Sequence, residues 1–83
     1  MPRYFFNTDD GETRLQDGEG MDLPDVQAAR AIAMSSLPDM ARDKLPNGDH
    51  FTFSVQVCDG VGTLLYSATL EFAGQWHVPP GGA

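Results

Sequence analysis

The sequence predicts an α+β domain with the element order β-β-α-β-β, in which a mainly antiparallel four-stranded sheet carries one helix on one face. Three observations lead to this prediction. Residues 51–72 alternate apolar and polar side chains in two runs, an Ala-rich segment from residue 26 has apolar residues at helical spacing, and an aromatic N-terminal segment precedes an Asp-Gly turn. Alternation with period two is typical of strands with one buried face, whereas spacing of three to four residues is typical of an amphipathic helix.

The first two strands are expected to form a hairpin. Residues 4–6 are aromatic and predict a strand, and residues 9–11, Asp-Asp-Gly, predict the turn, because Gly accepts a positive φ and Asp tolerates it. Residues 12–16 then predict a short returning strand at a sheet edge. In the expected register Tyr4 lies opposite Leu15, which places both side chains on the buried face.

A helix is expected to follow. Residues 23–25, Leu-Pro-Asp, predict its start, since Pro suits a first turn and an acid favours the positive helix end. Its apolar stripe consists of Val26, Ala29, Ala33 and Leu37. Because Pro38 cannot donate a backbone hydrogen bond, we expect a break or kink near residues 35–36. A short second helix should then run to about Lys44, before residues 45–48 end it.

The clearest signal is the second hairpin, whose alternating strands flank residues 59–62, Asp-Gly-Val-Gly. With a four-residue loop Val57 lies opposite Leu64, and a two-residue Asp59-Gly60 turn would keep the same faces. A slip by one residue would set apolar against polar side chains throughout. The expected core comprises Tyr4, Phe6, Leu15, Val26, Ala29, Ala33, Phe51, Phe53, Val55, Val57, Leu64, Tyr66, Leu70 and Phe72. We expect Trp76 to close one end of this core, the alternative being an exposed interface anchor.

Several motifs occur together in one order: Met-Pro-Arg-Tyr-Phe-Phe at residues 1–6, Asp-Gly, Asp-x-Glu-Gly, Leu-Pro-Asp, the Ala-rich helix and the second hairpin. In this order the chain resembles a family of small bacterial proteins known as a domain of unknown function. The sequence departs from the family pattern at Asn7, where the family is expected to have a histidine, and at residues 35–38, which interrupt the helix. The resemblance implies a fold and no chemistry.

Composition bounds the class of protein. The 83 residues predict one α+β domain over residues 1–76 and a flexible C-terminal tail over residues 77–83. A single cysteine, Cys58, excludes a disulfide within the chain and a Cys-rich zinc site. No apolar run is long enough for a membrane span or a signal peptide, so we expect a cytoplasmic protein. The net charge of −7 argues against nucleic-acid binding.

Residues 1–25 hold seven acidic side chains against two arginines. This acidic stretch is expected to be a solvated surface, with a weak calcium site as the alternative. Cys58 precedes Asp59, which disfavours a reactive thiolate, and Gly60-x-Gly62 joins two strands rather than a strand and a helix. We therefore expect no catalytic residues, no metal and no cofactor.

The outer face of the sheet is the candidate interface, because its residues are polar but mostly uncharged. These are Phe5, Thr52, Ser54, Gln56, Cys58, Leu65, Ser67 and Thr69. The sequence thus favours a small, acidic, non-catalytic interaction module that self-associates, as a homodimer, through this face or a strand edge. The alternative is an antitoxin-like or regulatory protein that binds a basic protein partner, and a small enzyme is a third interpretation.

Overall fold

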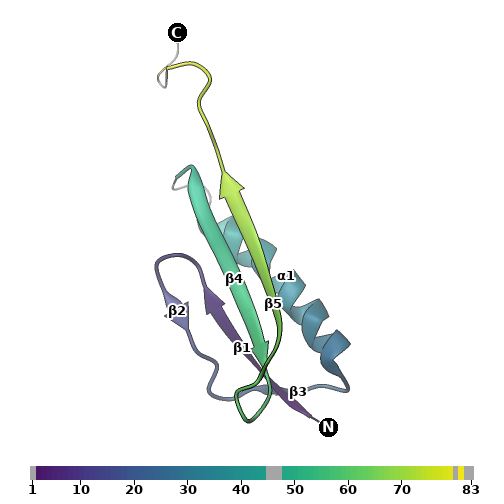
Figure 1. Ribbon diagram of the computed structural model, residues 1–83. Coiled ribbons are helices and arrows are strands. Elements are labelled where there is room, and N and C mark those ends of the chain that lie inside the picture. The colour runs from purple at the N-terminus through teal and green to yellow at the C-terminus, as the bar shows by residue number, and fades with distance from the viewer. Residues whose placement is uncertain (1, 45–47, 80, 82–83) are drawn as a thin grey trace.

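One helix lies across one face of an antiparallel sheet, as the sequence predicts (Figure 1). The computed structural model describes residues 2–44, 48–79 and 81. In chain order the elements are β1 (Arg3–Asp9), β2 (Arg14–Leu15), β3 (Met21–Asp22), α1 (Val26–Lys44), β4 (His50–Cys58) and β5 (Leu64–Ala73). The strands lie in the order β2-β1-β4-β5, and β3 pairs with the N-terminal end of β1. The two-residue β3 was not predicted.

The core lies between α1 and the central strands. On α1 the buried residues are four apart, because such positions share a helix face: Ala29, Ala33, Leu37 and Ala41. On the sheet the buried residues are Tyr4, Phe53, Val55 and Val57, and Phe6, Phe51 and Tyr66 pack partly buried against them. The alanines bring the helix backbone close to the sheet, since their side chains take little space. Ala41 is an addition to the predicted apolar stripe.

Five residues predicted to lie in the core are instead exposed, so this part of the prediction is wrong. They are Leu15, Val26, Leu64, Leu70 and Phe72. A helix is about 10 Å wide and neighbouring strands are about 4.8 Å apart, so a single helix covers about two strands. Here α1 packs mainly on β4, and the outer strands β2 and β5 receive less cover.

The helix does not break at Pro38, contrary to the prediction. α1 is continuous from Val26 to Lys44. Leu37 and Ala41 are buried on the two sides of the proline, so packing on the sheet holds both halves in one line. The Asp25 carboxylate caps the start by accepting the Ala28 N–H (2.9 Å). Of the segment predicted to end the helix, residues 45–47 lie outside the described residues.

Both hairpins differ from the prediction in register, and their paired side chains keep the predicted faces except at Leu64. In the second hairpin Val57 lies opposite Tyr66 rather than Leu64, with an irregularity at Val57–Cys58. The Asp59 carboxylate accepts the N–H groups of Val61 and Thr63, which stabilises a loop longer than the predicted one. This shift by two residues keeps the side chains of residues 66–73 on their predicted faces. Leu64 is the exception: it was predicted on the core face but lies opposite Cys58 on the other face, because the irregularity leaves Leu65 as an extra residue in β5.

In the first hairpin Leu15 lies opposite Thr8, not Tyr4. The Asp10 carboxylate accepts the N–H groups of Glu12 and Thr13, which turns the chain two residues later than predicted and shifts the register by four. Leu15 therefore shares the face of Tyr4 but lies beyond the helix, where it is exposed. The physical reason is local, because an aspartate side chain competes with the strand ladder for nearby N–H groups.

Trp76 does not close the core. The chain leaves the sheet after β5 and extends away from the body of the molecule (Figure 1), and Trp76 and Val78 are each 60% exposed. The predicted tail, residues 77–83, is described only at residues 77–79 and 81. In the part of the chain that the structure describes, α1 is not apolar enough over its length to cross a membrane.

Candidate interaction surface

The outer face is the side of the sheet away from α1, and the structure brings the predicted interface residues together there. On β4 and β5, Ser54 lies opposite Thr69 and Gln56 lies opposite Ser67. On β1, Phe5 lies opposite Cys58. Leu65 lies at the irregularity where β5 begins and is exposed. The eight predicted residues thus form one surface across three strands, with Thr52 at its far end.

Two shallow hollows lie on this outer face. One, of about 310 Å³, lies between β1, β2 and β4, and its polar side chains include Asn7, Arg14, Gln16 and Gln56. The other, of about 440 Å³, is lined by Phe5, Cys58 and the loop that follows β2. Asn7, which replaces the expected histidine, borders both hollows and donates from Nδ2 to the Cys58 Sγ at 3.9 Å. Both hollows are open, and none of the charged residues that line them is buried: Asp9, Arg14, Asp17 and Asp59.

The β1 edge of the sheet is covered by three different segments of the chain. Thr8 pairs with β2 and Tyr4 pairs with β3. Between them neither short strand reaches Phe6, whose N–H instead donates to the Asp17 carboxylate at 3.2 Å. The Asp17 side chain thus supplies the hydrogen bond that a longer edge strand would have supplied.

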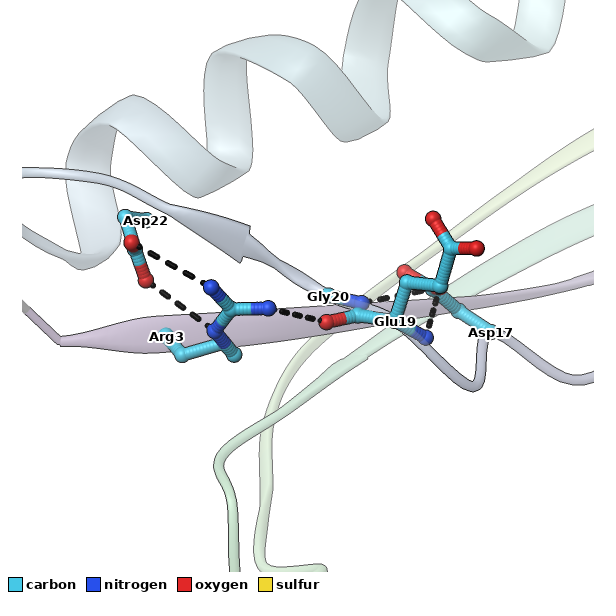
Figure 2. A network of polar contacts seen from close by, with 5 residues as sticks. All are labelled: Arg3, Asp17, Glu19, Gly20 and Asp22. Carbon is cyan, nitrogen blue, oxygen red and sulfur yellow. Dashed lines mark hydrogen bonds and ion pairs between the residues drawn. The ribbon is translucent and has the colours of Figure 1, made fainter.

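A polar network holds Asp17 at this position (Figure 2). Its Oδ1 accepts the N–H groups of Glu19 and Gly20, each at 3.0 Å, and its own N–H donates to the Asn7 Oδ1. The hydrogen bond from Gly20, together with those from Glu19 and Phe6 and the charge of Arg3, holds the pKa of Asp17 below its ordinary value of 3.8, although partial burial opposes this shift.

Arg3 and Gly20 complete the network. The Arg3 guanidinium pairs with the Asp22 carboxylate at 3.1 Å and donates to the Glu19 carbonyl. Gly20 has a φ of 75°, and a Cβ there would lie 2.8 Å from the Arg3 side chain and 2.9 Å from the Phe5 ring. Only glycine therefore fits where the loop crosses β1.

The acidic stretch is used mainly for local structure. The carboxylates of Asp9, Asp10, Asp17 and Asp25 each accept backbone N–H groups. Over residues 2–44, 48–79 and 81, no group of three or more His, Cys, Asp or Glu side chains is arranged to hold a metal ion.

The opposite edge of the sheet, the side of β5 away from β4, is here called the free edge. Within the described ranges no strand pairs with it. The Gly74 N–H donates to the Asp49 carbonyl at 2.6 Å, so Gly74 directs its polar groups toward the β4 side. In an antiparallel ladder this direction alternates, and the register runs without a break from Ala73 to Tyr66. The outward groups therefore belong to Ser67, Thr69, Glu71 and Ala73.

The free edge also carries the exposed apolar side chains that the prediction assigned to the core. Leu64, Leu70 and Phe72 lie on β5, and Met34 on α1 is 46% exposed. The Arg30 guanidinium lies 5.8 Å from the centre of the Tyr66 ring, so the side of α1 that carries Arg30 faces β5. Met34 lies one helical turn later on this same side. Sequence patterning could not identify this edge because it predicts faces and not strand order.

Comparison with known proteins gives a family and no activity. No curated protein and no solved structure matches the chain. One family model matches residues 3–71, a range that includes every strand except the last two residues of β5. The chain therefore belongs to the family described as Domain of unknown function (DUF6894).

Proposed function

We propose that this protein is a small interaction module that self-associates by pairing the free edge of β5 with the free edge of a second copy. The observation that carries the proposal is the set of outward N–H and C=O groups at Ser67, Thr69, Glu71 and Ala73, which the described residues leave without ladder partners. Antiparallel pairing of two such edges would join the two sheets into one.

The composition of β5 supports this proposal. Monomeric proteins commonly protect an edge strand with Lys, Pro, a bulge or a covering loop. β5 has an irregularity at Leu65, next to its start; from Tyr66 to Ala73 the ladder is regular, and this part has neither Lys nor Pro, with Glu71 as its only charged residue. The β1 edge, in contrast, is covered by β2, Asp17 and β3.

Stability gives a second reason. Only eight side chains of the described residues are buried, and three of these are alanines. A domain of this size is marginally stable, and association that requires the folded state stabilises it by mass action. Pairing at β5 would also remove water from Leu70 and Phe72, which are more than a third exposed in the single chain.

The test is sedimentation of the full chain over a range of concentrations, with two variants at one position. Thr69→Pro removes an outward N–H without removing a β4–β5 hydrogen bond, whereas Thr69→Val keeps the N–H and changes only the side chain. We expect the parent chain and Thr69→Val to form dimers and Thr69→Pro to remain monomeric with an unchanged circular dichroism spectrum.

If Thr69→Pro does not fold, Ala73→Pro removes another outward N–H at the end of β5 and replaces it in the experiment. A parent chain that is monomeric at high micromolar concentration contradicts the proposal. So does a folded proline variant that dimerises as tightly as the parent.

A further inference from the structure

We infer that the two copies pair in one register, centred on Leu70, and that Phe72 of each copy packs between the partner's Ala68 and the partner's Met34. This contact rests on the pairing at β5 proposed above and adds the register and the side chains that complete it. The partner is a second copy of this chain, and the contact lies on the α1 face of the joined sheet.

The outward polar groups of β5 define the register. They belong to Ser67, Thr69, Glu71 and Ala73, within the regular part of the ladder with β4. This set is symmetric about residue 70. An antiparallel pair with its two-fold axis at Leu70 therefore sets every outward residue opposite an outward residue of the copy, Ser67 opposite the partner's Ala73 and Thr69 opposite the partner's Glu71.

The neighbouring registers lose part of this pairing. An axis at Glu71 sets the two Glu71 carboxylates directly opposite each other, which is destabilising. An axis at Thr69 sets Ala73 opposite the partner's Leu65, at the irregularity of the strand. An axis halfway between two residues sets outward groups opposite groups that are directed at β4. The Leu70 register alone pairs all four outward residues.

The position of α1 brings Met34 level with Ala68. The helix and β5 run in the same direction (Figure 1), and the Arg30 guanidinium lies close to the Tyr66 ring. The helical turn from Arg30 to Met34 advances about 6 Å, and the two strand residues from Tyr66 to Ala68 advance about 7 Å. Met34 therefore lies level with Ala68 along β5, on the side of α1 that faces this strand.

The Leu70 register brings Phe72 to this same place. Phe72 lies opposite the partner's Ala68, so a large side chain meets a small one, which is partly buried. Both belong to the α1 face, because their ladder partners on β4 are Phe51 and Val55, which belong to the core. The small methyl group of Ala68 leaves room for the ring beside Met34.

The width of the joined sheet explains why large side chains are needed here. The two-fold axis is perpendicular to the sheet, so both α1 helices lie on one face. Each helix packs mainly on β4, and the two β4 strands are three strand spacings apart, about 14 Å. Helices in direct contact are about 8–10 Å apart, so the two helices leave a gap above the paired β5 strands. Leu70, Phe72 and Met34, all exposed in the single chain, lie at this gap.

The area that a stable dimer buries also requires this contact. Such an interface covers about 800 Å² on each copy. The eight residues from Tyr66 to Ala73 form an edge about 27 Å long, and a sheet with its side chains is about 10 Å thick, so the edge alone presents about 270 Å². The side of α1 next to β5 therefore has to contribute to the interface.

A disulfide tests the register. In the Leu70 register the Cα atoms of Leu70 and its copy are about 4.5 Å apart, which a disulfide can span. In a Cys58→Ser background, which removes the native thiol, Leu70→Cys should link two copies in the presence of oxidised glutathione. Ala68→Cys in the same background is the control, because the two copies of residue 68 lie about 13 Å apart along the strands. Non-reducing gel electrophoresis measures the linked fraction.

A double-mutant cycle tests the contact of Phe72 with Met34. Within one chain these side chains lie about 13 Å apart along the strand, so coupling between them reports a contact between copies. We expect Phe72→Ala to raise the dimer dissociation constant about tenfold or more and Met34→Ala about threefold or more. The double variant should raise it by less than the product of the two effects, because both substitutions remove the same contact.

Leu15→Ala is the control for the cycle. Leu15 is also an exposed apolar side chain, but it lies on β2 at the opposite edge, so its loss should change the dissociation constant by less than about twofold. If Phe72→Ala does not fold, Phe72→Leu replaces it, since leucine keeps an apolar side chain at this position of β5.

The results distinguish this contact from the pairing itself. A dimer in which Leu70→Cys does not link, or in which Ala68→Cys links as readily, overturns the register and leaves the β5 pairing standing. A dimer in which Phe72 and Met34 act independently overturns their contact in the same way. A parent chain that is monomeric throughout overturns both proposals.

Discussion

The two edges of this sheet show opposite solutions to the same problem. Every strand at an edge leaves N–H and C=O groups without a neighbour. At β1 these groups are satisfied within the chain, by β2 at Thr8, by the Asp17 carboxylate at Phe6 and by β3 at Tyr4. On the side of β5 that faces away from β4, the described residues provide no neighbouring strand along its ten residues.

The two edges differ in the residues that stabilise them. The covered edge uses an aspartate with a lowered pKa, an ion pair and a glycine at positive φ. The free edge uses none of these and keeps its apolar side chains exposed instead. Such a contrast is expected if the covered edge stays exposed to solvent and the free edge pairs with another strand.

The largest effect should distinguish the two sides of β5 itself. Ala68→Pro removes an N–H directed at β4 and should lower the free energy of unfolding by about 3 kcal/mol or more, whereas Thr69→Pro should cost about 1 kcal/mol or less. Urea unfolding at concentrations where the chain is monomeric measures both. Ala68→Ser, which keeps the N–H, is the control, and equal losses for the two proline variants would contradict the assigned direction of the edge groups.

A smaller effect is expected at the covered edge for Gly20→Ala. The new Cβ would meet the Arg3 side chain and the Phe5 ring, and an alanine disfavours the φ of 75°, so the free energy of unfolding should fall by about 2 kcal/mol. Gly18→Ala is the control, since a Cβ at residue 18 would have open space within 4 Å and the φ there is not positive. Urea unfolding measures both variants. Similar losses of stability would show that the close approach of Gly20 to Arg3 and Phe5 does not account for the effect.

The smallest effect should be the pH-dependent one at Asp17. Asp17→Asn puts an amide donor where a carboxylate oxygen accepts an N–H, and should cost about 1 kcal/mol near neutral pH. Because the pKa of Asp17 in the folded chain lies below 3.8, the charged carboxylate stabilises the fold above that value. This contribution is lost as the pH falls through the lowered pKa, so the difference between parent and variant should shrink in acid.

Urea unfolding across this pH range measures the difference. Glu19→Gln, the same charge change on an exposed neighbouring side chain, should show little of it. A parent–variant difference at Asp17 that stays constant as the pH falls would mean that the carboxylate charge does not support the covered edge.

The predicted fold class is confirmed, and so is the assignment of side chains to the two faces of β4 and of β5 from Tyr66 to Ala73; Leu64, beyond the irregularity at Leu65, lies on the other face. Alternation alone decides which side chains share a face, because the strand period is two. The registers of both hairpins were wrong by an even number of residues. Asp10 and Asp59 set those turns through side-chain hydrogen bonds that a hydrophobic pattern does not contain.

The candidate interface was predicted as a face, and its residues do lie together on the outer face. The free edge, which we propose as the contact surface, depends on strand order, and no local pattern contains strand order. Asp17 is a similar case, since Asp-x-Glu-Gly predicts a turn but not which strand the carboxylate caps. Its partner Phe6 is eleven residues away.

By itself the sequence determined the fold class, the two long strands of the second hairpin, the start of α1 and three of its four buried residues, because these depend on local periodicity and propensity. Only the tertiary structure decided that α1 continues through Pro38, that Leu70 and Phe72 are exposed, and that β5 has a free edge. The physical reason is that burial and edge pairing depend on which elements are neighbours. One helix is too narrow to cover every strand that carries an apolar face.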